Sequence, residues 1–274
     1  MGEIDYSRFV PNVHFEQIPI KNLVSNQEYQ RNLSQRHIQR TIQNFDVYQI
    51  NPVKVSRRDG LNYVVNGQHT IEIVAAVSGS RDTPVWCMVY DDMEYRNEAD
   101  IFANQQKYVR TLTTYEIFKA NIEAGNDDQL LIKDLVESFK LTLAARGGDC
   151  VICAVGALEE IYEKYGFHVL RRTLKLCVGS WQGEHYSLSG NILKGIAKLI
   201  SIYDEKIIDD YFIEKFGQTS VKDIIRSAKE RGGGANGYAE AILAIYNRKI
   251  KKQLDPTELN RTAKKNVQYF GKDE

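Results

Sequence analysis

The sequence predicts an α+β protein in which a small mixed-sheet N-terminal domain precedes an all-helical C-terminal domain. In the N-terminal part, short runs of β-branched and aromatic residues alternate with helical patterns. From Thr114 onward, apolar residues recur at the spacing of a helix, with glycines between the runs. These patterns predict a first domain over residues 1–120, a helical domain over 121–254 and a basic tail over 255–274.

The composition is typical of a globular protein without a charge bias. Of the 274 residues, 43% are hydrophobic and 26% are charged, and the formal net charge is zero. This length allows one large or two ordinary domains. A zero net charge gives no overall attraction to nucleic acid, so any basic surface must be local.

The sequence predicts a cytoplasmic protein with reduced cysteines. No run approaches the roughly 18 apolar residues of a membrane span, and Met1–Asp5 lacks the basic and apolar regions of a signal peptide. Only Cys150 and Cys153 have the spacing of metal or redox ligands. They lie in an apolar run of helical pattern, so two core thiols are predicted there and no metal site.

A broken strand and a basic helix are the first predicted elements. Residues Val13–Val24 alternate apolar and polar with a proline near the middle, which is typical of an edge strand. In Ser34–Phe45 the apolar residues share one helical face, and Ser34 is the expected N-cap. A basic face is usually just solvated, and a phosphate or DNA contact is the alternative. The basic residues here are Arg31, Arg36, His37 and Arg40.

A β-hairpin, a helix and a further strand follow. Ile50–Val55 and Leu61–Val65 flank Asp59-Gly60, a strong signal for a tight turn. A helix is predicted to begin near Thr70. Thr83–Tyr90 has the pattern of another buried strand, and helical patterning resumes at Asn97.

The functional prediction rests on the turn between the hairpin and its helix, Asn66-Gly67-Gln68-His69-Thr70. The first backbone N–H groups of a helix have no intrahelical partner, and the helix dipole makes this end positive. Such a turn therefore suits a phosphate or another anion. Gly67 lets the backbone approach a ligand closely, and the next three residues offer side-chain donors. The alternative is an ordinary strand-turn-helix connection.

His69 is the one candidate for a catalytic role, and two interpretations of it stand open. In the first, it donates a hydrogen bond to a phosphate or acts as a general base near neutral pH. In the second, it only forms a hydrogen bond across the turn.

The C-terminal part carries helical stripes, a glycine run and a basic end. Gly232-Gly233-Gly234 follows a helix and lacks a P-loop lysine, so a loop or hinge is predicted there. The basic end suits nonspecific contact with phosphate backbones, although most such tails are solvated. The predicted helices span Tyr115–Phe118, Leu130–Phe139, Ile152–Tyr165, Phe167–Trp181, Leu188–Tyr203, Ile207–Phe216, Val221–Ala228 and Tyr238–Ile250. The basic residues of the end are Arg248, Lys249, Lys251, Lys252, Arg261, Lys264 and Lys265.

Three motifs in the first 120 residues resemble the N-terminal domain shared by the ParB partition proteins and sulfiredoxin. Ile50–Val55 resembles the family's "QPIVV" strand, Val65–Ala76 its "DGQHRxxAA" box, and Phe102–Lys107 lies where the family has "ENLQR". Glu28–Arg31 resembles the "YQR" entry of related restriction proteins. The helical remainder resembles that of uncharacterised phage and prophage proteins carrying this domain.

The resemblance implies a nucleotide site. Members of this superfamily bind CTP or ATP, with the phosphates over the glycine turn, so CTP or ATP with Mg²⁺ is the implied ligand. Carried over to this chain, the phosphate-binding residues are Gly67, Gln68, His69 and Thr70, preceded by Asn66. Asn104 and Gln106 lie opposite them in the resemblance, near the triphosphate or a metal, and Arg31 contacts a phosphate or DNA.

Departures from the family pattern favour binding over catalysis. The arginine of the box is Thr70 here, and the metal-ligating glutamate of "ENLQR" is Ala103. The sulfiredoxin cysteine is replaced by Gln68, which removes the nucleophile for sulfinic-acid repair. Hydrolysis of a nucleotide needs charge stabilisation that these changes take away. Any activity would then be that of a weak NTPase or a nuclease.

Three functions remain open from the sequence. The first is a nucleotide- or DNA-associated ParB-like module, of phage or mobile-element origin. The second is a metal-dependent nuclease, which would need clustered carboxylates; Asp91, Asp92 and Glu94 are the nearest candidates. The third is a non-catalytic adaptor that binds protein through its helical domain. Fold class alone does not choose among them.

Overall fold

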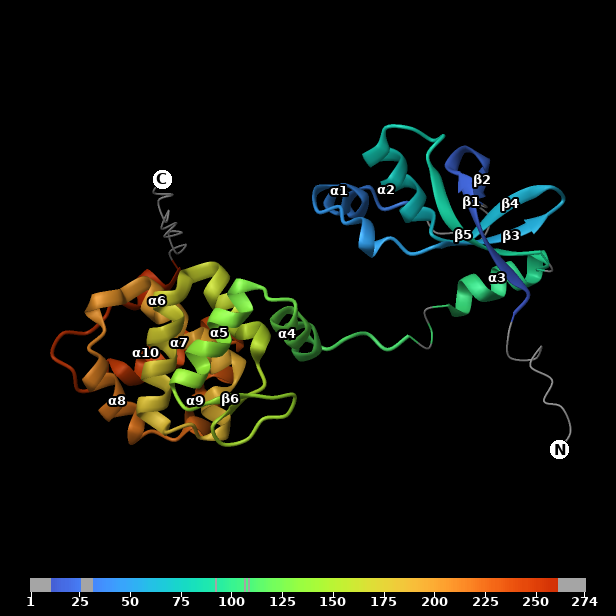
Figure 1. The fold of residues 1–274 in the computed structure, drawn as a ribbon. Helices are drawn as coiled ribbons and strands as arrows, with labels where there is room; N and C mark the ends of the chain where they lie inside the picture. The colour runs from blue at the N-terminus through green and yellow to red at the C-terminus, as the bar shows by residue number, and fades with distance from the viewer. Residues whose placement is uncertain (1–10, 26–31, 92, 106, 108, 261–274) are drawn as a thin grey trace, which may run out of the picture. The chain divides into compact units, whose positions relative to one another are not determined.

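The computed structural model describes residues 11–25, 32–91, 93–105, 107 and 109–260, and it divides the chain into two compact units (Figure 1). The first unit ends at Arg110 and the second begins at Thr111. The predicted boundary at residue 120 falls inside helix α4, Thr114–Glu123. This helix packs against α5 (Asp127–Ser138) and α6 (Val155–Trp181), and so belongs to the second unit.

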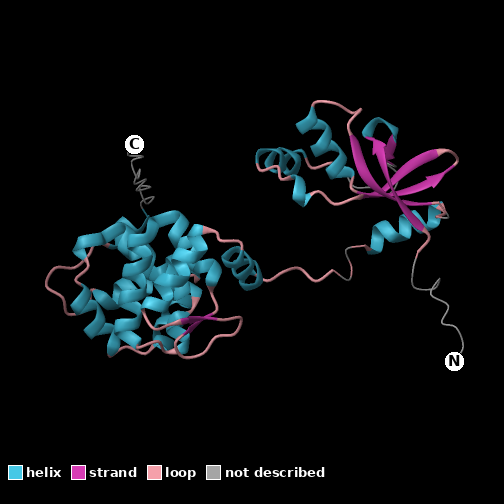
Figure 2. Ribbon diagram, viewed as in Figure 1, coloured by secondary structure: helices cyan, strands magenta, loops and turns pink. Residues whose placement is uncertain are grey.

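In its described residues, the first unit contains the predicted mixed sheet with three α-helices, which confirms the α+β class (Figure 2). Its sheet has five strands in the order β1-β5-β3-β4-β2. Strand β3 runs parallel to β5 and antiparallel to β4, while β1 runs antiparallel to β5 and β2 parallel to β4. The strands are β1 Val13–Pro19, β2 Leu23–Ser25, β3 Val53–Arg58, β4 Leu61–Asn66 and β5 Pro84–Tyr90, and the helices are α1 Gln35–Gln43, α2 Gln68–Ser78 and α3 Tyr95–Asn104.

Local sequence signals explain the chain reversals of this unit. The predicted break in the first strand lies at Pro19, where β1 ends and the 3₁₀ turn Ile20–Asn22 leads into β2. In the β3–β4 hairpin, Asp59 and Gly60 have φ of +52° and +74°. Two positive φ values are what a type I′ hairpin turn requires, and Asp-Gly accepts them readily. Ser34 is the N-cap of α1, as predicted, and its hydroxyl accepts a hydrogen bond from the His37 N–H at 3.3 Å.

The hydrophobic core of the first unit lies between one face of the sheet and helix α2. Alternate residues of β3, β4 and β5 point to this face because side chains alternate along a strand. Ile71 of α2 packs on them, with Val74 and Ala75 at its margin. The core residues are Ile18, Ile20, Leu23, Val53, Val55, Val64, Ile71, Val85, Cys87 and Val89.

A buried ion pair attaches α3 to the other face of the sheet. The Arg58 guanidinium Nε donates to Glu98 Oε1 at 2.7 Å, and the Glu98 side chain is fully buried. The same guanidinium lies 3.9 Å from the ring centroid of Tyr63 on β4. The hydrogen bond to Glu98 raises the pKa of Arg58 further above its ordinary value. Arg58 therefore fixes α3 against the β3–β4 hairpin.

The second unit is helical, with one short departure. Strands β6 (Thr142–Leu143) and β7 (Val151–Ile152) pair in parallel, so the prediction of a helix from Ile152 is wrong at its start. Besides α4, α5 and α6, the helices are α7 Gly190–Tyr203, α8 Asp209–Gly217, α9 Val221–Glu230 and α10 Gly234–Tyr246. At Gly166 (φ +83°) the helical geometry of α6 is interrupted, where the sequence predicted two separate helices.

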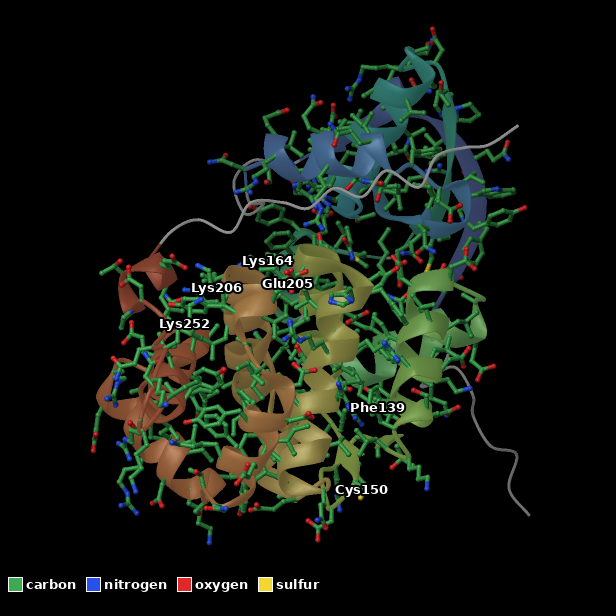
Figure 3. The ribbon with its side chains drawn as sticks, turned by 90° about the vertical axis from the view of Figure 1, so that its left-hand side faces the viewer. Phe139, Cys150, Lys164, Glu205, Lys206 and Lys252 are labelled. Carbon is green, nitrogen blue, oxygen red and sulfur yellow. The ribbon has the colours of Figure 1, made fainter. Side chains whose placement is uncertain are left out.

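The two closely spaced cysteines are surface residues and not core thiols. Cys150 and Cys153 are exposed, whereas Cys87 and Cys177 are buried. The prediction failed because Cys150–Cys153 spans a turn and the short strand β7 rather than a helix, so both thiols face away from the core. Figure 3 shows Cys150 at the periphery of the helical unit, at the end remote from Lys164. Burial raises the pKa of Cys87 to about 11.

The predicted basic tail begins within the fold. Residues Pro256–Asn260 form a 3₁₀ turn that packs on α10 and α7, with Leu254 and Leu259 buried. The Tyr203 hydroxyl donates to the Asp255 carbonyl at 2.6 Å. Burial, with nearby Glu258 and Asp255, raises the pKa of Tyr203 to about 12. Arg261, Lys264 and Lys265 lie outside the described residues.

None of the helices in the described parts of the chain combines the length and the apolar character needed to span a membrane.

Candidate functional site

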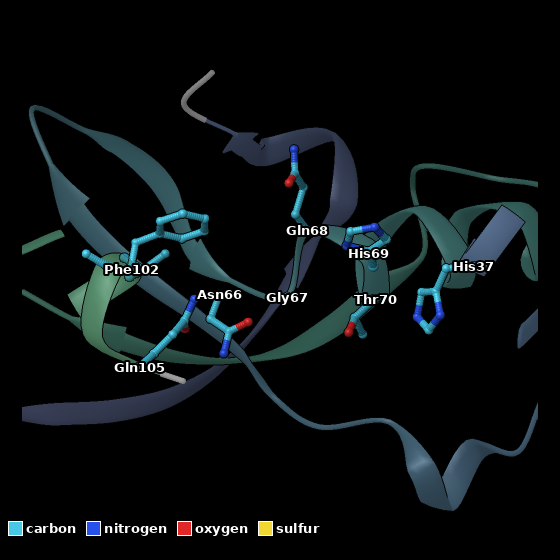
Figure 4. Close-up of a pocket in the computed structure, with 10 residues that line it drawn as sticks. His37, Asn66, Gly67, Gln68, His69, Thr70, Phe102 and Gln105 are labelled. Carbon is cyan, nitrogen blue, oxygen red and sulfur yellow. The ribbon is translucent and has the colours of Figure 1, made fainter. Parts of the chain in front are cut away.

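A cavity of about 360 Å³ lies over the turn between β4 and α2, where the sequence predicted a phosphate site (Figure 4). This volume is within the range of small-molecule sites. Helix α1 contributes one wall through His37, and α3 contributes another through Phe102, Ala103 and Gln105. The lining residues are His37, Val65, Asn66, Gly67, Gln68, His69, Thr70, Phe102, Ala103 and Gln105. The cavity thus collects all five residues of the predicted turn.

Gly67 is required at this turn for two reasons. First, it is the N-cap of α2 with φ +112° and ψ +14°, a backbone conformation that residues with a Cβ atom rarely adopt. A Cβ at this position would also lie 3.1 Å from both γ-methyl groups of Val53 and 3.2 Å from its Cα. The turn therefore lies directly on buried strand β3, and glycine is the residue that permits it.

The N-terminus of α2 is suited to an anion. The first intrahelical hydrogen bond runs from the Ile71 N–H to the Gly67 carbonyl at 3.0 Å, so the N–H groups of Gln68, His69 and Thr70 precede the helical ladder. Helices α1 and α4 have serine or threonine N-caps whose hydroxyls accept from the first turn. Gly67 has no side chain to do this. A phosphate oxygen would occupy the position that a capping hydroxyl holds in those helices.

His69 connects the turn to α1. Its Nε2 accepts a hydrogen bond from the Ser34 backbone N–H at 3.0 Å, just before α1 begins. This bond assigns the neutral ring proton to Nδ1. The His37 ring stands nearly perpendicular to that of His69, with centroids 5.4 Å apart. The Nε2 atom is thus engaged in holding α1 beside α2, and a role as general base through Nε2 would require this bond to break.

The opposite end of the cavity offers an amide oxygen from Gln105, the C-cap of α3. Gln105 Oε1 is buried and has no hydrogen-bond partner among the described residues. Buried polar atoms in folded proteins are nearly always satisfied, so an unsatisfied one inside a cavity suggests a water, an ion or a ligand. Asn66 and Gln105 lie toward one end of the cavity in Figure 4, and His37 and His69 toward the other.

Of the two predicted residues near the end of α3, the structure describes Asn104. The Asn104 amide donates to the Asp100 carbonyl at 3.0 Å and to Asp100 Oδ1 at 2.9 Å, so the Asn104 side chain lies along its own helix. It does not line the cavity, whereas its neighbour Gln105 does. Side chains of successive helical residues point about 100° apart around the helix axis. This explains why Gln105 faces the cavity while Asn104, one residue before it, does not. Gln106 lies outside the described residues.

Of the predicted basic residues, His37 lines the cavity, whereas Arg36 and Arg40 do not. Arg36 and Arg40 are both exposed and four residues apart on α1, so they share one face of that helix. Helix α1 contains no acidic residue. Arg31 lies outside the described residues. None of the described lining residues is an Asp, Glu, Lys or Arg.

The acidic residues considered for a nuclease have structural contacts. Asp91 Oδ2 lies 2.9 Å from His14 Nδ1. Glu94 is the N-cap of α3 and forms a reciprocal capping box with Asn97. Asp92 lies outside the described residues. Within the described residues, no group of three or more His, Cys, Asp or Glu side chains could hold a metal ion.

Sequence reasoning did not assign five of the lining residues to the site: His37, Val65, Phe102, Ala103 and Gln105. From the sequence, His37 was described only as part of a basic face. The helix that carries it, α1, packs on α2, and this contact brings His37 to the cavity. Phe102 and Gln105 belong to the motif that resembles "ENLQR". The resemblance predicted that this segment lies opposite the turn, but it did not predict which of its side chains face the turn.

Comparison with known proteins gives a family but no function. Among curated proteins, no match was found. One solved structure similar to this chain is that of the C-terminally truncated chromosome-partitioning protein ParB from Caulobacter crescentus in complex with CTP-gamma-S. The similarity has a TM-score of 0.35 and 14% sequence identity, and it covers 85% of this chain and 98% of the ParB chain. The model of a family of unknown function, DUF6551, matches residues 24–259. The match covers most of the sequence and extends through both units, so the chain belongs to the DUF6551 family.

Proposed function

We propose that the N-terminal unit binds a nucleotide, with its phosphates at the N-terminus of α2 in the cavity over Gly67. The observation that carries this proposal is a cavity of ligand size whose floor is a glycine-capped helix N-terminus. The resemblance of Asn66–Thr70 to the glycine turn of the ParB and sulfiredoxin domain supports the same placement and makes CTP and ATP the candidate ligands.

The far end of the cavity suits the nucleoside. Gln105 Oε1 would accept a hydrogen bond from an amino group of the base or a hydroxyl of the sugar, which would satisfy its unpaired oxygen. Phe102 provides aromatic surface beside it. One ligand would then connect the positive end of α2 with the acceptor from α3.

The proposed site favours binding over hydrolysis. Phosphoryl transfer needs cationic groups at the transferring phosphate, and the described lining supplies two histidines and backbone N–H groups instead. Proteins hold Mg²⁺ mainly through carboxylates together with substrate phosphates. The described lining contains no carboxylate, so it offers no such ligand to Mg²⁺.

Paired variants of two neighbouring residues test the binding site. We expect Gln105→Ala to weaken the binding of CTP or ATP about tenfold, because one hydrogen bond to the ligand is worth about 1 kcal/mol and its loss leaves a ligand group unpaired. Asn104→Ala is the matched control, since Asn104 lies on the same helix but bonds to Asp100. Isothermal titration calorimetry with and without Mg²⁺ measures both. Equal affinities for the two variants, or no heat with either nucleotide, would contradict the proposed site.

We also propose that the exposed face of α1 contacts DNA through Arg36 and Arg40. Each phosphate contact releases counterions, so the log of the affinity falls with the log of salt concentration in proportion to the number of contacts. Replacing both arginines by alanine is expected to lower the salt slope of DNA binding by about two. Fluorescence anisotropy over a salt series measures this slope. An unchanged slope would remove α1 from the DNA interface.

Other functional predictions remain at the level of the sequence. A phage or mobile-element origin and a metal-dependent nuclease activity have no specific observation in their favour. The adaptor function would gain support if neither nucleotide nor DNA binds.

A further inference from the structure

Strand β1 forms one end of the five-stranded sheet. It pairs with β5 on one side, and its other edge has no strand partner in the described part of the chain. A free edge presents unpaired backbone N–H and C=O groups and can pair with another chain. Natural proteins usually shorten such strands or place a lysine or proline within them. Strand β1 is seven residues long, and its proline is at the last position.

Two exposed aromatic side chains adjoin this edge. Phe15 pairs with Met88 of β5, and Gln17 pairs with Trp86, so Phe15 and Trp86 are diagonal neighbours on one face of the sheet. Phe15 is 59% exposed and Trp86 is 55% exposed. Helix α3 covers the β3–β4 part of the same face, where Ser56 and Glu98 are fully buried. Phe15 and Trp86 therefore lie at the β1 end of this face, and α3 covers the β3–β4 part.

The order of residues along β1 is complementary to itself. In an antiparallel pair of two β1 strands centred on Phe15, His14 of each copy lies opposite Glu16 of the other, and Phe15 faces Phe15. The His14 and Glu16 side chains are 44% and 43% exposed. Within its own chain His14 contacts Glu16 and Asp91, and Glu16 accepts a hydrogen bond from Arg57, so contacts across the strand pair would add to these. Centring the pair on His14 or on Glu16 would instead place identical ionisable side chains opposite each other. The pairing of His14 with Glu16 at two symmetric positions thus selects one register.

We propose that β1 pairs antiparallel with β1 of a second copy of this chain, centred on Phe15. The pairing joins two five-stranded sheets into one continuous sheet with twofold symmetry. It satisfies the free backbone groups of both edges and covers Phe15 with its symmetry mate. This interface is separate from the nucleotide cavity, because no residue of β1 or β5 lines that cavity.

Sedimentation equilibrium of the full chain over a concentration series tests this dimer. We expect a reversible monomer–dimer equilibrium that Phe15→Lys shifts to monomer, since it places two lysines against each other on the symmetry axis. Tyr48→Lys is the matched control, because Tyr48 is a 93% exposed aromatic residue outside the sheet. It should leave the dimerisation constant unchanged.

A charge exchange tests the register. His14→Glu places like charges opposite each other at two symmetric positions and should weaken the dimer about tenfold. The double variant H14E/E16K makes those pairs complementary again and should restore the constant to within about threefold. Circular dichroism verifies that each variant is folded.

A chain that is monomeric at all concentrations, or a dimer unaffected by Phe15→Lys, would overturn the proposal. Failure of the double variant to restore the dimer would overturn the register. Nucleotide affinity is measured separately, so the two proposals fail independently.

Discussion

Replacing Gly67 by alanine is expected to destabilise the N-terminal unit by about 2–4 kcal/mol. A left-handed backbone conformation costs a residue with a side chain about 1–2 kcal/mol, and overpacking of a core costs about 1–3 kcal/mol. Both apply here, because φ is +112° and the new methyl group would press on Val53. Hydrogen exchange of β3 and β4 peptides over a urea series measures the stability of this unit within the full chain.

Gly79→Ala provides the control at the other end of the same helix. Gly79 is the C-cap of α2 with φ +70°, and a Cβ there would meet nothing within 4 Å. It should cost about 1–2 kcal/mol for the backbone conformation alone. If Gly67→Ala destabilises the unit no more than Gly79→Ala does, the close approach of the turn to β3 is not the constraint we infer.

Replacing Arg58 by alanine is expected to destabilise the N-terminal unit by about 3–5 kcal/mol. Removing one partner of a buried ion pair leaves the other charge buried and uncompensated. The Glu98 carboxylate is fully buried and lies 2.7 Å from the Arg58 guanidinium. The loss should also free α3 and thereby disturb the wall that carries Gln105, so nucleotide affinity should fall together with stability. The same urea series with hydrogen exchange, extended to α3 peptides, measures both the size and the place of the effect.

The adjacent arginine is the matched control for this effect. Arg57 lies 2.7 Å from Glu16, but that carboxylate is 43% exposed. The hydrogen bond from Arg57, opposed by partial burial, holds the pKa of Glu16 below its ordinary value. An exposed pair contributes about 0–1 kcal/mol, so Arg57→Ala should cost far less than Arg58→Ala. Equal losses for the two variants would show that burial of Glu98 does not determine the energy.

The elements with local signals were predictable from the sequence. Asp59-Gly60 predicted the hairpin, Ser34 predicted the start of α1, and Gly67 predicted the strand-to-helix turn. Each of these predictions depends only on the local preferences of one or two residues. The mixed sheet followed from the alternation of strand and helix patterns. For the same reason, the five turn residues of the candidate site could be listed before the structure was known.

Features that depend on distant contacts were not predictable in this way. The choice between Asn104 and Gln105 depends on how α3 is rotated against the sheet, and the buried pair of Arg58 and Glu98 is one of the contacts that join them. The bond between the Ser34 N–H and His69 joins residues 35 positions apart. Cys150 was assigned to a helix because apolar residues in a short run fit a strand and a buried helix equally well.

The most direct test of the central claim is an NMR titration of the backbone amides of α2 with CTP and with ATP. We expect the amide resonances of Gln68, His69 and Thr70 to shift progressively and to saturate together, because their N–H groups donate to the phosphates. Inorganic triphosphate should shift the same three amides, while the Gln105 side-chain amide should respond to the complete nucleotide only. Unchanged resonances at Gln68–Thr70, with nucleotide shifts elsewhere or nowhere, would contradict a phosphate site at this turn.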